Sequence, residues 1–103
     1  MIVDGHNDLL LHRWRGEPTL HLDLEAARAA GFSGGFFAMY VPSPRSPDPT
    51  EIPYALPLPE PIPFGEASRI ANELFDELCA LPVVRAISAD DFREGQILSL
   101  IHI

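Results

Sequence analysis

The segment from Pro42 to Pro63 constrains the fold of this chain more than any other feature. Nine of its 22 residues are proline. Proline lacks the backbone N–H that helices and inner strands use for hydrogen bonding, and its ring fixes the φ angle. We therefore predict that residues 42–63 form a semi-extended surface loop between two structured parts of the chain.

The part before this loop shows a strand–helix–strand pattern. Ile2–His6 is predicted to be a buried strand, and residues 34–41 (GGFFAMYV) a strand buried on both faces, as in a parallel sheet. Leu9–Leu11 follows the first strand and either covers its end or begins an irregular turn. An Ala-rich helix is expected over residues 24–30, with Asp23 as its N-cap and Gly31 just past its end.

The part after the loop repeats the alternation. Residues 65–81 predict an amphipathic helix, because their apolar side chains recur with the helical period. A short strand is expected over residues 83–87, and Ser88 is expected to cap a helix that begins near Ala89. Strands that alternate with helices predict an α/β fold with a parallel sheet and covering helices.

Composition narrows the class of protein. With 47% hydrophobic residues the chain can form a core, and its net charge of −8 argues against nucleic-acid binding, which needs a basic surface. No signal peptide is visible, and no apolar run approaches the roughly 20 residues that span a bilayer. We expect a cytoplasmic protein without a membrane segment. Cys79, the sole cysteine, is expected to be a small buried hydrophobe.

The last six residues, Leu98–Ile103, differ in character from the arginine- and alanine-rich body. Reverse-translated, this hexapeptide can spell the transposase end sequence that is used to prepare sequencing libraries. We hypothesise that residues 98–103 are a non-native tail and that the natural sequence departs from this one after Ile97. Resequencing the locus tests this, and a native gene that continues through these six residues contradicts it.

One motif, His6-Asn7-Asp8, has residue types that bind metal ions. His6 and Asp8 are separated by one residue at the end of the first predicted strand, so their side chains are expected on one side, where an imidazole and a carboxylate can bind one cation. A second copy of the pattern, His21-Leu22-Asp23, precedes a helix, so capping is preferred for Asp23. His12 is expected to lie in solvent or to contact a metal ligand without binding the metal itself. For Trp14, packing is at least as well supported as a role in lining a substrate cleft.

The context of this motif resembles a known family. The string Val3-Asp4-Gly5-His6-Asn7-Asp8-Leu9 is similar to the opening of the membrane (renal-type) dipeptidases, the M19 zinc metallopeptidases. A second similarity follows in order: His21–Leu24, then Arg28, Gly31 and residues 34–42. A looser one covers the helix from Glu66 to Leu81 and the stretch from Ser88 to Asp91.

This resemblance implies a (β/α)8 barrel much longer than the present chain, two zinc ions bridged by a glutamate, and cleavage of dipeptides. Residues 1–97 would be the N-terminal part of that barrel, including the proline-rich loop at 42–63. His6 and Asp8 would bind the more buried zinc and act neither as nucleophile nor as acid. The bridging glutamate is expected in a later Glu-Gly-Gly-like stretch, and Glu94 does not match it. The fragment itself is expected to lack activity, and its substrate-binding residues are unknown.

Alternatives remain open at this point. The chain could belong to another metal-dependent amidohydrolase that cleaves a lactone, an ester or a cyclic amide on the same barrel. A third hypothesis is that the chain is a small acidic interaction module whose proline-rich segment binds the aromatic groove of an SH3 or WW domain. A homodimer is an open alternative for the full-length protein.

Overall fold

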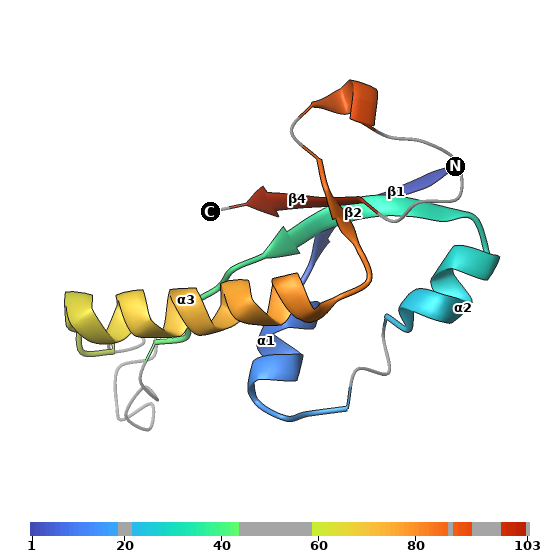
Figure 1. The fold of residues 1–103 in the computed structure, drawn as a ribbon. Helices are drawn as coiled ribbons and strands as arrows, with labels where there is room; N and C mark the ends of the chain where they lie inside the picture. The colour runs from blue at the N-terminus through green and yellow to red at the C-terminus, as the bar shows by residue number, and fades with distance from the viewer. Residues whose placement is uncertain (19–21, 44–58, 87, 92–97, 103) are drawn as a thin grey trace, which may run out of the picture.

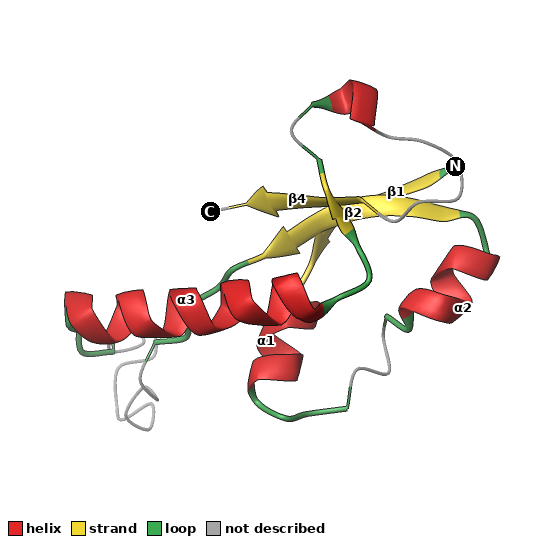
Figure 2. Cartoon of the chain, in the orientation of Figure 1, coloured by secondary structure: helices red, strands yellow, loops and turns green. Residues whose placement is uncertain are grey.

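The computed structural model describes residues 1–18, 22–43, 59–86, 88–91 and 98–102. Its centre is a four-stranded sheet with the strand order β1-β2-β4-β3, in which each pair of neighbours is parallel. The strands are β1 (Ile2–Asn7), β2 (Phe32–Ala38), β3 (Val84–Arg85) and β4 (Leu98–His102). The helices α1 (Leu9–Trp14), α2 (Leu24–Ala29) and α3 (Phe64–Ala80) lie on one side of the sheet (Figures 1 and 2). The predicted parallel α/β architecture is confirmed.

Strand β1 forms one edge of the sheet. It pairs with β2 from Ile2, opposite Phe32, to Asn7, opposite Phe37. The strand predicted at Ile2–His6 is therefore present, but the prediction that it is buried is wrong. Ile2 is 53% exposed and Val3 47% exposed. An apolar strand is buried only where other elements cover it, and an edge strand with helices on one side of the sheet lacks that cover.

Strand β2 is buried along nearly its whole length, as predicted. It begins at Phe32 and ends at Ala38, whereas the sequence pattern placed it over residues 34–41. The difference arises because pairing with β1 sets the boundaries. Ile2 meets Phe32 directly after the turn at Gly31, and residues beyond Ala38 have left the ladder.

Helices α2 and α3 follow the sequence pattern closely. Asp23 Oδ1 accepts a hydrogen bond of 2.9 Å from the Ala26 amide, which is the predicted N-cap. Gly31, directly after the C-cap residue of α2, has a φ of 92°, which glycine adopts without a steric penalty. Helix α3 buries side chains at the helical period, as its sequence predicts, namely Ile70, Leu74 and Leu78.

Helix α1 was not predicted, because three consecutive leucines show no helical period. Leu9, Leu10 and Leu11 are all buried, and Leu9 and Leu10 belong to the same core cluster as Phe37 and the buried stripe of α3. Tertiary packing thus decides the conformation of this segment. The helix ends at Trp14, and Arg15 is its C-cap residue.

The core excludes Cys79, so the expectation of a buried cysteine is wrong. Cys79 follows the buried Leu78 by one position on α3, which turns its side chain about 100° away from the core-facing stripe. Among the described helices, none is both long and apolar enough to cross a bilayer.

The C-terminal part differs in detail from its prediction. Strand β3 has two residues, Val84 and Arg85, rather than the predicted five, of which residue 87 lies outside the described part. The helix expected after Ser88 is a 3₁₀ turn, η1 (Ala89–Asp91). At this turn the Ser88 amide donates to Asp91 Oδ2 at 2.9 Å, and the Asp91 amide donates to the Ser88 carbonyl oxygen at 3.2 Å.

The six-residue tail supplies strand β4. Leu98–His102 lies between β2 and β3, and Gly34 pairs with Leu98 and Ala38 with His102. This pairing uses backbone N–H and C=O groups, which an apolar hexapeptide of any origin offers. The non-native origin of residues 98–103 therefore stays a prediction.

Candidate metal-binding site

Both candidate ligands lie where β1 passes into α1. His6 is near the end of β1, and Asp8 is the N-cap residue of α1. Because β1 and β2 run parallel, this is the carboxyl end of the sheet, where α/β barrels collect their functional groups. Residues 39–43, which lead into the proline-rich segment, leave β2 at the same end. Residues 44–58 of that segment lie outside the described part.

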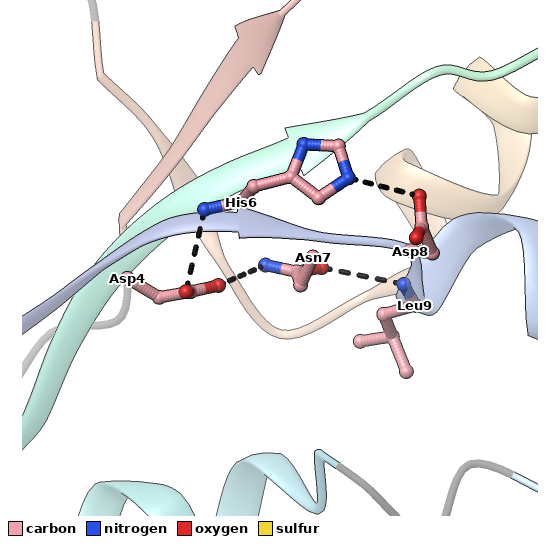
Figure 3. Close-up of polar contacts among 5 residues, drawn as sticks. All are labelled: Asp4, His6, Asn7, Asp8 and Leu9. Carbon is pink, nitrogen blue, oxygen red and sulfur yellow. Dashed lines mark hydrogen bonds and ion pairs between the residues drawn. The ribbon is translucent and has the colours of Figure 1, made fainter.

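The two side chains point toward each other. His6 Nε2 and Asp8 Oδ1 are 3.2 Å apart, and the side chains are 57% and 46% exposed (Figure 3). Two donor atoms on one tetrahedral zinc ion, each about 2.1 Å from the metal, lie about 3.4 Å apart. The pair therefore has both the donor types and the spacing that one zinc ion requires. With Nε2 protonated, the same spacing is a hydrogen bond from His6 to Asp8.

The carboxylates of Asp8 and Asp23 have different partners, although both residues precede a helix. Asp23 is committed to the α2 amide of Ala26. Asp8 makes no side-chain cap bond to α1, so its Oδ1 faces the imidazole of His6 instead. Of the two His-x-Asp copies, the first thus keeps a carboxylate available for a cation. His21, the histidine of the second copy, lies outside the described residues.

A hydrogen-bonded frame surrounds the pair (Figure 3). Asp4 Oδ1 accepts from the His6 amide at 3.3 Å, and Asp4 Oδ2 accepts from Asn7 Nδ2 at 3.0 Å. Asn7 Oδ1 in turn accepts from the Leu9 amide at 3.3 Å. Short Asp and Asn side chains commonly bond to the backbone two residues further on, which is what both residues do here.

A cavity of about 370 Å³ opens beside this frame. It is lined by polar and apolar side chains, namely Asp4, His6, Asn7, Asp8, Leu9, His12 and Leu22. His12 was expected in solvent or behind the ligands. It is half-buried, lines the cavity, and its Nδ1 pairs with Glu17 Oε2 at 2.7 Å.

Helix α3 anchors α1, which begins directly after Asp8. Trp14 Nε1, at the end of α1, donates to Glu73 Oε2 at 2.7 Å. Arg69 donates to the other oxygen of Glu73, also at 2.7 Å, and Arg13 pairs with Glu77 at 2.9 Å. The hydrogen bond from Trp14, and then that from Arg69, hold the pKa of the Glu73 carboxyl below its ordinary value. Trp14 also packs against the hydrophobic core cluster, as foreseen, and it does not line the cavity beside His6.

Within the described residues, the candidate site consists of two side chains, His6 and Asp8. There, no group of three or more His, Cys, Asp or Glu side chains is placed to hold a metal ion. Glu94 lies outside the described part. Tyr40, two residues past the end of β2, is 53% exposed and does not line the cavity.

Sequence reasoning missed Asp4, Asn7 and the Trp14–Glu73 contact. The spacing of Asp4 to His6 and of Asn7 to Leu9 is a local signal for two side chain–backbone turns, and it could have revealed the frame. Trp14 and Glu73 are 59 positions apart, and no local pattern links them.

The fold and the candidate site together define a class: a portion of a parallel α/β protein with a histidine–aspartate pair of metal-binding type at the carboxyl end of its first strand. Within that class, the chain is similar to a solved structure described as a dipeptidase, a metallopeptidase of family M19. The identity is 30% and the TM-score 0.73, and the match covers 98% of this chain and 36% of that one. The resemblance to the M19 family and the partial-barrel fold are thereby confirmed. No protein-family model and no curated protein matches the sequence.

Proposed function

We propose that this chain is the segment of a zinc dipeptidase that holds one zinc ion through His6 and Asp8. The observation that carries the proposal is the 3.2 Å separation of His6 Nε2 and Asp8 Oδ1 at the carboxyl end of β1. The similarity to an M19 dipeptidase supports it, although the chain spans 36% of that protein. Peptide-bond hydrolysis is assigned to the full-length protein, in which a second zinc and the remaining ligands come from outside this chain.

The role of the two residues is to hold and orient the ion. His6 binds through an unprotonated Nε2, and the Asp8 carboxylate offsets part of the positive charge. Zinc, when bound, lowers the pKa of water so that hydroxide is available near neutral pH. With two ligands instead of the usual three or four, this segment alone should bind zinc weakly and should not turn over substrate.

The substrate proposed is a dipeptide. A cavity of about 370 Å³ is in the range of small-molecule sites. Its lining mixes apolar side chains, such as Leu9 and Leu22, with polar ones, as a substrate with a polar backbone and variable side chains requires. No specific observation favours the proline-rich interaction module, whose residues 44–58 lie outside the described part.

The test compares the two His-x-Asp copies in the full-length protein. His6→Ala and Asp8→Ala should each remove most bound zinc and most dipeptide turnover. His21→Ala and Asp23→Ala should keep both, although loss of the Asp23 cap should cost about 0.5–2 kcal/mol of stability. Zinc content, dipeptide turnover and circular dichroism are measured on all four variants.

Two outcomes contradict the proposal. Full zinc content and turnover in His6→Ala, with loss of both in His21→Ala, would show that the second copy holds the metal. Hydrolysis of a lactone or cyclic amide at rates far above those for dipeptides would favour a different amidohydrolase.

A further inference from the structure

Asn7 lies between the two proposed ligands in the sequence, and its side chain connects the backbone on either side of them. Its amide nitrogen donates to Asp4, whose other oxygen accepts from the amide of His6. Its amide oxygen accepts from Leu9, the residue after Asp8. The Asn7 side chain, through Asp4, therefore links the backbone N–H of His6 with the backbone N–H of Leu9 (Figure 3).

The direction of these bonds is determined by their end groups. The carboxylate of Asp4 can only accept, and the Leu9 N–H can only donate. Asn7 must therefore turn its NH₂ group toward Asp4 and its oxygen toward Leu9. Asparagine offers one donor and one acceptor on opposite sides, so it satisfies both ends at once, whereas a carboxylate at position 7 would face a second carboxylate 3.0 Å away.

The strand backbone supports the same frame independently. Asp4 pairs with Gly35 and Asn7 with Phe37, so β1 has one residue more than β2 between these positions, which is a β-bulge. The bulge includes His6 and changes where its side chain points. Gly35 lies against it: a Cβ atom there would be 3.1 Å from Asp4 Cβ and 3.4 Å from Asn7 Nδ2.

We infer that Asp4 and Asn7 are positioning residues that hold His6 and Asp8 at the separation one zinc ion requires. This inference rests on the proposed function. Neither residue needs to touch the metal. They hold the bulged end of β1 and the first turn of α1, so that the imidazole and the carboxylate stay directed at one point. Groups that orient metal ligands in this way typically change metal affinity 10–100-fold when mutated.

The test exchanges the two residues in the full-length protein. Asn7→Asp alone brings two carboxylates together. In Asp4→Asn alone, the new side chain accepts from the His6 amide through its oxygen, so its NH₂ group faces the NH₂ group of Asn7 and the bond between the two side chains is lost. The double variant Asp4→Asn/Asn7→Asp keeps all three bonds with the polarity of the middle one reversed, and it keeps the net charge.

Zinc dissociation constants are measured on the metal-free proteins by competition with a chelator, and thermal unfolding of the same metal-free samples reports folding. Each single variant should bind zinc about 10-fold or more weakly than the wild type. The double variant should recover most of the affinity. Asp76→Asn, which removes an exposed carboxylate from α3, is the matched charge control and should bind like the wild type.

The outcomes separate this inference from the proposed function. Single variants that bind zinc like the wild type, while His6→Ala does not bind, overturn the positioning role alone. Weakened zinc binding in the single variants that the double variant does not recover also overturns the positioning role, because the double variant restores the hydrogen bonds of the frame. His6→Ala with wild-type affinity overturns the proposed function itself.

Discussion

Trp14 Nε1 donates a 2.7 Å hydrogen bond to Glu73 Oε2, which joins the last residue of α1 to the middle of α3. Helix α1 is six residues long and begins directly after Asp8. Together with the buried leucines of both helices, this bond determines where α1 lies and hence where the carboxylate at its N-terminus lies. Arg69 holds the second oxygen of Glu73, so the carboxylate is bound from two sides.

The contact with Glu73 predicts a pH dependence of stability. Because the Trp14 and Arg69 bonds lower the pKa of Glu73 in the folded protein, its ionised form stabilises folding. That contribution is complete above the ordinary glutamate pKa of 4.5 and is lost as the pH falls through the lower folded value. Urea unfolding of the full-length protein should show Glu73→Gln to be less stable than wild type at pH 7, with the gap closing in acid. A gap that is independent of pH contradicts this.

Burial rather than residue size should decide the cost of truncating apolar side chains of α3. Leu74 is fully buried at 0% exposure, whereas Phe64 is 87% exposed. Leu74→Ala should cost about 2–5 kcal/mol of the free energy of unfolding. Phe64→Ala removes a larger side chain but should stay within about 0.5 kcal/mol. Denaturant unfolding of both variants checks this, and similar costs for the two would refute the packing described here.

Two glycines in and beside the proposed metal motif should differ in how much stability they lose when changed to alanine. A Cβ at Gly35 would contact Asp4, Phe32 and Asn7 at 3.1–3.4 Å, so Gly35→Ala should cost about 1–3 kcal/mol. Gly5 has no atom within 4 Å of such a Cβ, so Gly5→Ala is the matched control and should be close to neutral. Thermal unfolding distinguishes them. Equal stability of the two variants would show that β1 and β2 do not approach as closely as described.

The isolated 103-residue chain should associate through β1. Strand β2 is buried between β1 and β4, so its apolar residues are not available for association. Ile2 and Val3 on the edge strand are exposed instead, and an apolar edge strand is a template for further pairing. Val3→Lys should therefore reduce aggregation in light scattering, whereas Val84→Lys at the other edge tests whether both edges contribute. A monomer with a cooperative thermal transition would contradict the prediction.

The features that could be predicted from the sequence depend on residues only a few positions apart. The cap at Asp23, the left-handed Gly31 and the buried stripe of α3 follow from local hydrogen bonding and helical period, and the structure has all three. The sequence also predicted that His6 and Asp8 converge. The cause differs from the prediction, because a bulge in β1 and the start of α1, rather than a regular strand, bring the two side chains together.

Which apolar side chains are buried could not be predicted locally, because burial depends on the packing of distant elements. Leu9–Leu11 is helical because Phe37 and the leucines of α3 cover it, and Ile2 and Val3 are exposed because β1 is an edge. These outcomes depend on partners far along the chain, as the 59 positions between Trp14 and Glu73 illustrate. A local pattern states which side chains favour burial, but the free energy of burial is gained only where a distant element removes them from water.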